Sequence, residues 1–270
     1  MPLTADQAAE AARILQDHRR RAAPLAALPD ALHPATAEDG YAIQVALVAL
    51  RGREDRARPI GWKIGATNAG AREMLGVHEP FLGVLLSSMT LDAPAGAAAE
   101  VAAAGMFQRV VEPEIALLIG VDLDPADAPF DAAAIREAVE TVLPAIEIVD
   151  TPLAAGLKAG GPALIGDGGA HGLWVRGKPF DGWEALDLVE HRVTLSIDGA
   201  LLREGRGGNV EGGPFAATAW LANALAARGV GLKAGDYVTT GTTTQPAPAA
   251  AGQTVVADFG RLGRVELRFT

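Results

Sequence analysis

The order of helical and strand patterns along this chain is the feature that most constrains its fold. Residues 4–26 are rich in Ala, Leu, Arg and Gln, which favour helix, and Thr4 is placed to cap them. A second helix is expected to begin near Thr36, whereas short apolar strands with tight turns dominate the final third of the sequence. Because strands and helices do not alternate regularly, the pattern predicts an α+β fold rather than an alternating α/β fold.

Further elements are predicted from local periodicity and from residues that cap or break regular structure. Helices are expected at residues 69–75, within residues 126–142 and at residues 214–228. Asp131 is the predicted cap of the second of these, and the pair Asp198-Gly199 predicts a type I′ hairpin turn. Residues 93–104 and 151–161 lack periodicity and are expected to be connections. Strands are expected at residues 59–66, 81–86, 89–91, 110–119, 143–149, 193–197, 201–202, 237–240, 254–259 and 265–269.

The composition excludes several kinds of site and partner. The 270 residues include no cysteine, which rules out disulfides, thiolate zinc sites, iron–sulfur clusters and thiol nucleophiles. A net charge of −10 argues against binding to nucleic acid. Although the mean hydropathy is +0.19, no apolar run approaches the roughly 20 residues of a membrane span, and the N-terminus lacks a secretory signal pattern. The sequence therefore predicts a cytoplasmic protein with no nucleic-acid or membrane partner.

Two glutamates in one apolar strand pattern form the first candidate site. In residues 110–120, VVEPEIALLIG, Glu112 and Glu114 are expected to point to the same face, about 7 Å apart along the strand. That face continues with apolar residues, and two desolvated carboxylates repel each other unless a cation lies between them. The alternative is a solvated edge strand, in which Pro113 prevents further pairing.

A third glutamate strengthens the metal interpretation. Glu147 lies between two isoleucines in the strand pattern LPAIEIVD, and a lone ionised glutamate is rarely fully buried. If this strand neighbours residues 110–119, three glutamates can converge on one hard cation. Carboxylate oxygens with water suit Mg²⁺ or Mn²⁺, so one of these two ions is the predicted cofactor.

Lys63 is a further candidate, because it lies in the tight apolar strand pattern GWKIG. Most lysines are solvated at the surface, and that is the alternative interpretation. A lysine beside a metal would instead hold an anionic substrate or move protons.

Several motifs, taken in order, resemble those of a known enzyme family. They are GWKIGATN, EPFLGVLL, EPEIALLIG, VLPAIEIVD, GNVEGGPFAATAWLANAL and GDYVTTGTTTQPAP. From about Ala37 to the C-terminus, the chain resembles the 2-keto-4-pentenoate hydratase group of the fumarylacetoacetate hydrolase superfamily. That group includes 2-oxohept-3-enedioate hydratases and 4-oxalocrotonate decarboxylases. The helical N-terminal region is also similar to the extension that the hydratase branch carries.

The resemblance implies a fold and an activity. The implied fold is a mixed β-roll with flanking helices, in one catalytic domain of residues 1–270 with a helical extension at 1–58 and a core at 59–270. The implied activity is the metal-dependent addition of water to a 2-hydroxydienoate or 2-oxoenoate, giving a 4-hydroxy-2-oxo acid, in the catabolism of aromatic meta-cleavage products by a homo-oligomer. Decarboxylation of a 2-oxo acid and C–C hydrolysis or isomerisation are the alternatives within the superfamily. A catalytically weak metal- and acid-binding accessory protein is the alternative from another class.

The resemblance also implies roles for particular residues. Glu112, Glu114 and Glu147 match the metal ligands, and Lys63 matches the active-site lysine. The turn Gly241–Pro246 matches the segment that helps to hold the substrate's carboxylate. The candidate substrate-binding residues are Gly241, Thr242, Thr243, Gln245, Asp167 and Arg109.

Two departures from the family pattern fall on the substrate side. Phe81 stands where hydratases of this group usually carry an aspartate, so His78 and Glu79 join Lys63 as candidate catalytic residues. The alternative for His78 is an ordinary loop histidine. Of the family's Asp-Asn-Ala-Ser-like motif, this chain keeps only the aspartate, Asp167. This residue is either a substrate-binding residue or a turn residue. His171 follows this turn, close enough to belong to the site but with little else to support it.

Overall fold

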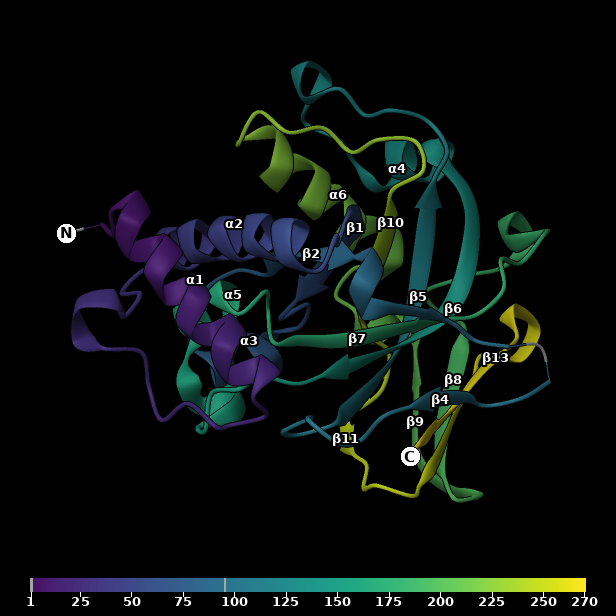
Figure 1. Cartoon of the computed structure of the whole chain (residues 1–270). Helices are drawn as coiled ribbons and strands as arrows, with labels where there is room; N and C mark the ends of the chain where they lie inside the picture. Colours follow the sequence, from purple (N-terminus) through teal and green to yellow (C-terminus); the bar gives the residue numbers. More distant parts are fainter. Residues whose placement is uncertain (1, 95) are drawn as a thin grey trace.

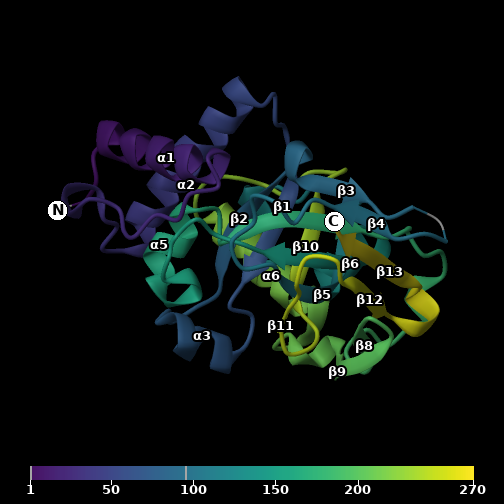
Figure 2. The same cartoon turned by 60° about the horizontal axis from the view of Figure 1, so that its bottom comes forward.

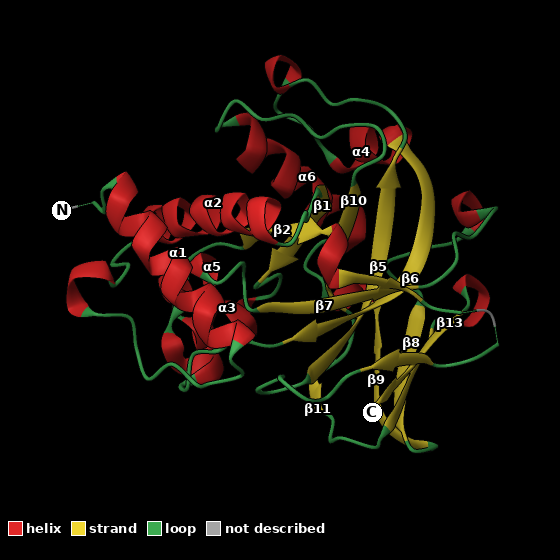
Figure 3. Ribbon diagram, in the orientation of Figure 1, coloured by secondary structure: helices red, strands yellow, loops and turns green. Residues whose placement is uncertain are grey.

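The protein combines helices and strands in the computed structural model, which describes residues 2–94 and 96–270 (Figure 1). The helices are α1 Ala5–Arg20, α2 Ala37–Glu54, α3 Ala69–Leu75, α4 Ala132–Ala138, α5 Gly161–Gly166 and α6 Gly213–Ala226. The strands are β1 Pro59–Gly65, β2 Phe81–Leu86, β3 Thr90–Asp92, β4 Ala99–Val101, β5 Val110–Ile119, β6 Val139–Val149, β7 His171–Arg176, β8 Arg192–Ile197, β9 Ala200–Arg206, β10 Tyr237–Thr242, β11 Ala247–Pro248, β12 Thr254–Asp258 and β13 Arg264–Phe269. Helical elements thus precede a strand-rich second half, and the predicted α+β class is confirmed (Figure 3).

The described strands form two mixed sheets. The larger has the order β2-β1-β10-β5-β6-β7-β3, with β11 paired to β5, and the smaller has the order β4-β13-β12-β8-β9. Most neighbours are antiparallel, but β1 and β10, β3 and β7, and β4 and β13 are parallel pairs. Strands β5 and β6 lie at the centre of the larger sheet. Their nearly continuous apolar sequences fit this position, because a central strand covered on both faces exposes neither of them.

A helical layer of α1, α2 and α5 lies beside the larger sheet, on the side away from the smaller sheet (Figures 1 and 2). Apolar residues recur on one face of each long helix at the spacing of helical turns, and these faces pack together. The buried contacts of this layer include Ala11, Leu15, Ile43, Leu47 and Ile165. Helix α6 packs against α4 and contacts β10 and β1.

The predicted helix starts are confirmed by their caps. Thr4 and Thr36 each accept a hydrogen bond from the backbone of the third helical residue, whose own side chain bonds back to the cap. Asp131 caps α4 by accepting from Ala134 N at 2.8 Å. The predicted hairpin turn is also confirmed, since Asp198 and Gly199 both have positive φ, as a type I′ turn requires.

Several predicted boundaries are wrong, each for a local or tertiary reason. Within the helix-rich stretch 4–26, the first helix covers Ala5–Arg20, because Ala22 adopts a positive φ and Pro24 cannot continue a helix. Within the expected connection 93–104, Ala99–Val101 forms β4 by pairing with β13. The expected connection 151–161 gives way to α5 at Gly161, and β6 begins at Val139 rather than residue 143. Among the described helices, none is long and apolar enough to cross a membrane.

Candidate active site

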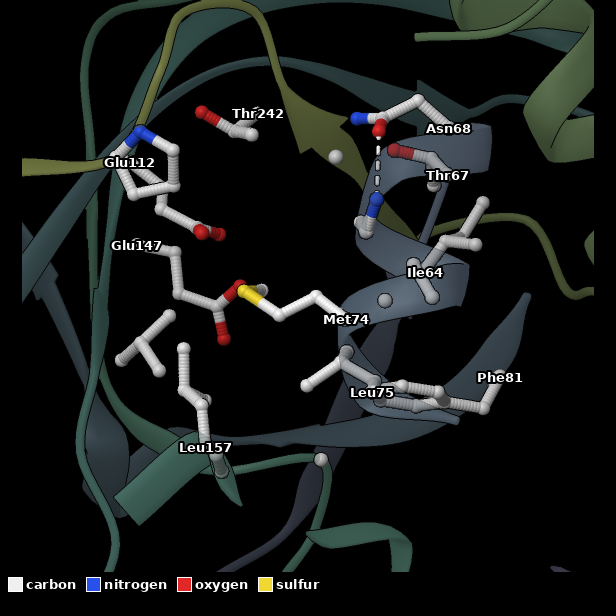
Figure 4. A pocket seen from close by; sticks show the side chains of 18 of the residues that line it. Ile64, Thr67, Asn68, Met74, Leu75, Phe81, Glu112, Glu147, Leu157 and Thr242 are labelled. Atoms are coloured by element: carbon white, nitrogen blue, oxygen red, sulfur yellow. Dashed lines mark hydrogen bonds between the residues drawn. The ribbon is translucent and has the colours of Figure 1, made fainter. Parts of the chain in front are cut away.

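The three glutamates singled out in the sequence converge at the centre of the larger sheet. Strands β5 and β6 pair so that Glu112 lies directly opposite Glu147, and Glu114 follows two residues later on the same face of β5. One carboxylate oxygen from each of the three lies within 4.8 Å of the others. Glu112 and Glu147 project into the same cavity (Figure 4), while Glu114 is almost fully buried and does not line it. The predicted pairing of the two glutamate strands is therefore confirmed.

Burial and mutual repulsion make this cluster electrostatically costly without a cation. Burial raises the pKa of Glu112 to about 7, and the nearby charge of Glu147 adds to the rise. Burial also raises the pKa of Glu114 well above its usual range, with contributions from the charges of Glu147 and Glu112. The Oε2 atom of Glu114 accepts hydrogen bonds from the Thr239 hydroxyl and from Gly241 N, whereas its buried Oε1 has no hydrogen-bond partner among the described residues. A buried oxygen without a partner indicates that a ligand is to be expected there.

Lys63 lies beside Glu147 and is the nearest positive charge to the cluster. Its Nζ atom is 2.8 Å from Glu147 Oε1 and donates to the carbonyl of Gly169 at 2.8 Å. Burial alone lowers the pKa of Lys63, but the charge and hydrogen bond of Glu147 outweigh burial and raise it, so the ammonium form is held. The lysine side chain can be buried because its partner on the neighbouring strand β2 is Gly83. A Cβ atom at that position would approach Lys63 Cγ to 2.7 Å. A surface lysine, the alternative interpretation, is thus wrong.

His171 is the second hydrogen-bond partner of Glu147. Its Nδ1 atom lies 2.8 Å from the same Oε1 oxygen, and the ring is buried. Burial lowers the pKa of His171, so a neutral ring that donates from Nδ1 satisfies this contact. Against the effect of burial, Lys63 and His171 hold the pKa of Glu147 below its usual range and keep it ionised.

The donor set suits a hard divalent cation. The cluster has three carboxylates, and one of them has a buried oxygen without a hydrogen-bond partner among the described residues. Lys63 offsets the charge of only one carboxylate. Oxygen ligands of this kind are those preferred by Mg²⁺ and Mn²⁺, and a divalent ion would relieve the repulsion among the carboxylates. Glu112, Glu114 and Glu147 therefore fit such an ion.

The pKa shifts predict that metal stabilises this protein more at pH 8 than at pH 5.5. The raised pKa values of Glu112 and Glu114 give the metal-free protein stability at low pH that is lost as the pH rises from about 4.5 through 7. The lowered pKa of Glu147 makes the stability of the protein fall as the pH is lowered, but only below about pH 4.5, so it does not affect this range. The increase in Tm caused by 5 mM MnCl₂ should therefore grow by several degrees across this range. An equal Tm increase at both pH values, or one matched by KCl of equal ionic strength, would contradict the prediction.

A cavity of about 320 Å³ opens over Glu112 and Glu147. Helix α3, held at its start by Asn68, which accepts from Ala71 N at 2.9 Å, forms one wall with Met74 and Leu75 (Figure 4). Lys63 is the only lysine or arginine among the described residues that line the cavity. The apolar lining residues are Ile64, Ala66, Ala71, Met74, Leu75, Phe81, Val149, Leu157, Leu164, Ala170 and Pro246, and the polar ones beyond Lys63 and the two glutamates are Thr67, Asn68, Thr242, Thr244 and Gln245.

The substrate-binding candidates of the turn 241–246 divide into two groups. Gly241, Thr242 and Gln245 line the cavity. Thr243 does not line it, because its side chain is buried and its hydroxyl donates to the carbonyl of Pro113 at 2.8 Å. Thr243 instead fastens the turn to β5, close to the carboxylate cluster.

The remaining candidates lie outside the cavity lining. His78 and Glu79 are exposed and line a separate depression of about 310 Å³. Arg109 donates to the carbonyl oxygens of Ala249 and Met106. Asp167 is fully buried behind the cavity and pairs with Arg19 at 2.8 Å. The structure therefore does not bring these four side chains to the carboxylate cluster, and Phe81 contributes only an apolar wall.

His171 is the site residue that sequence reasoning undervalued. It begins β7, which pairs with β6 so that His171 lies opposite Val149, two residues beyond Glu147. No strand was predicted at residues 171–176, because glycines precede it and its alternation is irregular. A strand prediction there would have placed the histidine beside a metal strand.

A family model locates this fold among known proteins. The model described as fumarylacetoacetate (FAA) hydrolase C-terminal matches residues 84–270, well over half of the chain. The chain belongs to the fumarylacetoacetate hydrolase family. The fold agrees: the solved structure of 4-oxalocrotonate decarboxylase from Pseudomonas putida G7, complexed with magnesium and adipate, superposes with a TM-score of 0.90, at 23% identity and covering 99% of each chain. The expected β-roll with flanking helices is confirmed.

Several relatives with curated names are hydratases. The 2-hydroxyhexa-2,4-dienoate hydratase of Comamonas testosteroni is 35% identical over 257 residues, covering 95% of each chain. The 2-keto-4-pentenoate hydratase of Paraburkholderia xenovorans is 30% identical over 268 residues, covering 99% of this chain and 96% of its own. The second similarity spans nearly the whole chain, so it includes the N-terminal helices as well as the part that the family model matches.

Proposed function

We propose that this protein is a divalent-metal-dependent hydro-lyase that adds water to a 2-hydroxydienoate with an apolar distal end, giving a 4-hydroxy-2-oxo acid. Two relatives of 30% identity or more, matched over nearly their whole length, are hydratases of substrates of this class. The proposal places the reaction in the catabolism of aromatic ring-cleavage products. Homo-oligomerisation stays a prediction.

One observation carries this proposal: a carboxylate cluster with a buried lysine lies at one end of a cavity with mostly apolar walls. Glu112, Glu114 and Glu147 would hold Mg²⁺ or Mn²⁺, and the bound cation supplies a Lewis acid to the oxygens of a 2-oxo acid. The magnesium in the structure of the 4-oxalocrotonate decarboxylase supports the choice of a divalent ion.

The chain's own residues supply the rest of the chemistry. Lys63 is a charged proton donor at the carboxylate end, and its hydrogen bond to Gly169 fixes its direction. At the mouth, the hydroxyl of Thr242 and the amide of Gln245 offer polar contacts for the substrate. The walls formed by Leu75, Phe81 and other apolar residues exclude bulk water from the substrate's hydrocarbon chain.

Decarboxylation of a 2-oxo dicarboxylate is the second candidate, and the cavity lining disfavours it. A distal carboxylate would need a cation to offset its desolvation, which costs several kcal/mol for an unpaired ion. Lys63, the only lysine or arginine among the described lining residues, is already engaged by Glu147. A neutral distal methyl or vinyl group therefore fits these walls better than a second carboxylate does.

We expect purified protein with Mg²⁺ to prefer 2-hydroxyhexa-2,4-dienoate over 2-hydroxyhexa-2,4-dienedioate by about 10²-fold or more in kcat/KM, because the second carboxylate cannot be paired. Loss of the dienol absorbance measures the rate, and NMR identifies a 4-hydroxy-2-oxo acid as the product. Faster consumption of the dicarboxylate with release of CO₂ would instead establish a decarboxylase.

A paired substitution at the cavity mouth sharpens this experiment. Met74 lines the cavity and has an exposed fraction of 62%, so it tolerates a polar replacement. Met74→Lys should raise the relative kcat/KM for the dicarboxylate, whereas Met74→Gln, of similar length but uncharged, should not. Equal effects of the two variants would show that charge at the mouth does not set the preference.

A further inference from the structure

Helix α1 of the N-terminal region contacts the back of the site through Arg19. Its guanidinium donates to Asp167 Oδ2 at 2.8 Å and to the carbonyl of Asp150 at 3.0 Å, and it also lies 3.5 Å from Asp150 Oδ2. Asp167 and Asp150 are almost completely buried, with exposed fractions of 0% and 1%. Arg19 is the only described hydrogen-bonding or ionic side-chain partner of the Asp167 carboxylate, whose Oδ1 atom has none.

Asp167 begins a five-residue segment, Asp167–His171, whose other end forms part of the active site. The carbonyl of Gly169 accepts from Lys63 Nζ, and the His171 ring bonds to Glu147 Oε1. Both the lysine and the metal-site glutamate are therefore held by atoms of this segment. Arg19 lies at one end of it and the reacting groups at the other.

The backbone of this segment is of a kind that needs support. Gly168, Gly169 and Ala170 have φ values of +74°, +75° and +58°, in the left-handed region. Glycine adopts positive and negative φ values about equally, so it does not select this conformation, and alanine is strained in it. External contacts must therefore select this one shape. The backbone amides of residues 167–169 bond to α5, and the ion pair between Asp167 and Arg19 ties the segment to α1.

We propose that Arg19 is a positioning residue: by holding Asp167, it fixes the segment that directs Lys63 and Glu147. The N-terminal helix is then a working part of the site, although it lies outside residues 84–270 that match the family model. The expected effect of Arg19 on turnover rests on the proposed hydratase function.

Arg51 provides a matched control in the same helical layer. It lies on α2 with an exposed fraction of 4%, and its Nε donates to Gln16 at 2.9 Å. It makes no hydrogen bond to residues 167–171 among those described. Arg19→Met and Arg51→Met each remove one guanidinium from this layer, so both are expected to lower Tm. Arg51 acts on Asp167 and His171 only through longer-range charge, so only Arg19→Met removes a hydrogen bond to the segment and releases it. Arg19→Lys keeps the charge and should recover part of the loss.

Three readouts test the proposal at a temperature where all variants are folded. Hydrogen exchange monitored by mass spectrometry should be at least about tenfold faster in Arg19→Met at residues 163–172, where the amides of Asp167, Gly168 and Gly169 bond back to α5. Mn²⁺ affinity, measured by calorimetry, should fall about tenfold. The kcat for the dienoate should fall about 10²-fold with KM changed by less than about threefold, since displaced catalytic groups affect turnover more than binding.

The outcomes separate this inference from the proposed function. Unchanged exchange at residues 163–172 in Arg19→Met would overturn it, and so would faster exchange with wild-type Mn²⁺ affinity and wild-type kcat. Equal losses in Arg51→Met would also overturn it, because they would reflect general destabilisation. If the wild-type protein hydrates no dienoate, the proposed function fails, but exchange and Mn²⁺ affinity still decide the role of Arg19.

Discussion

Glu114→Gln is expected to abolish the response of the protein to Mn²⁺ and, at the same time, to stabilise the metal-free protein at pH 8. The two effects have one cause. Glu114 is almost fully buried beside Glu112 and Glu147, and burial with the charges of these neighbours raises its pKa well above the usual range. Neutralising it removes repulsion when no metal is bound, but it also removes one of three charged oxygen ligands.

The glutamine side chain suits this test because it preserves the other contacts of Glu114. Its carbonyl oxygen can still accept from Gly241 N and from the Thr239 hydroxyl, as Oε2 does in the structure. The amide nitrogen then replaces Oε1, the atom for which the described residues provide no partner. Loss of metal binding can therefore be attributed to the ligand rather than to a collapsed turn.

Thermal denaturation with and without 5 mM MnCl₂ measures both effects. We expect the metal-free Tm at pH 8 to rise by about 2 °C or more, Mn²⁺ affinity to fall at least about 10²-fold, and hydratase activity to fall with it. Glu140→Gln is the matched control, since Glu140 is an exposed residue of β6 and should leave all three quantities unchanged. A Glu114→Gln protein that keeps the full metal-induced rise in Tm would show that the metal site is placed wrongly.

The elements that could be predicted from the sequence are those specified by local chemistry. Thr4 and Asp131 were identified as caps because their side chains satisfy backbone N–H groups within the next turn, which requires no tertiary information. The bounds of β2 and β5 agree with the predicted strands 81–86 and 110–119, because each is a dense apolar run between turn residues.

The elements that were missed depend on partners distant in the sequence. Strand β4 is formed by an alanine-rich segment with weak strand preference, and it is ordered by parallel pairing with β13. Helix α5 is short and rich in Gly and Pro, but it is buried against α2, which supplies the free energy that its own sequence lacks. Such tertiary effects leave no local periodicity to read.

The same distinction applies to the site. The spacing of Glu112 and Glu114 fixes their common face from the strand period alone, whereas the position of Glu147 depended on a pairing that the sequence could state only as a condition. His171 was noticed but undervalued, and Arg19 was beyond reach, because each acts across more than twenty residues of chain. His78 and Glu79 were chosen from their nearness in sequence to Phe81, and strand β2 carries Phe81 toward the cavity while they remain outside it.

Lys63→Met is expected to have the opposite signature to Glu114→Gln: metal binding is kept and turnover is lost. Methionine has nearly the length of the lysine stem and can occupy the space that Gly83 leaves beside it. The variant loses the only positive charge among the described residues that line the cavity. A cation competes with the metal for the charge of Glu147, so its removal should leave Mn²⁺ affinity equal to or higher than that of the wild type.

Turnover should fall about 10³-fold, because proton transfer by a positioned side chain contributes roughly 10² to 10⁴ in rate. Calorimetry with Mn²⁺ and the dienol absorbance assay, run on the same preparation, measure the two quantities. Lys158→Met is the control, since Lys158 is an exposed lysine next to Leu157, which lines the cavity. If Lys63→Met loses metal and stability together while a metal-saturated sample retains kcat, Lys63 is a structural counter-charge for Glu147. If kcat alone is lost, the buried ammonium takes part in the reaction, and metal binding does not depend on Lys63.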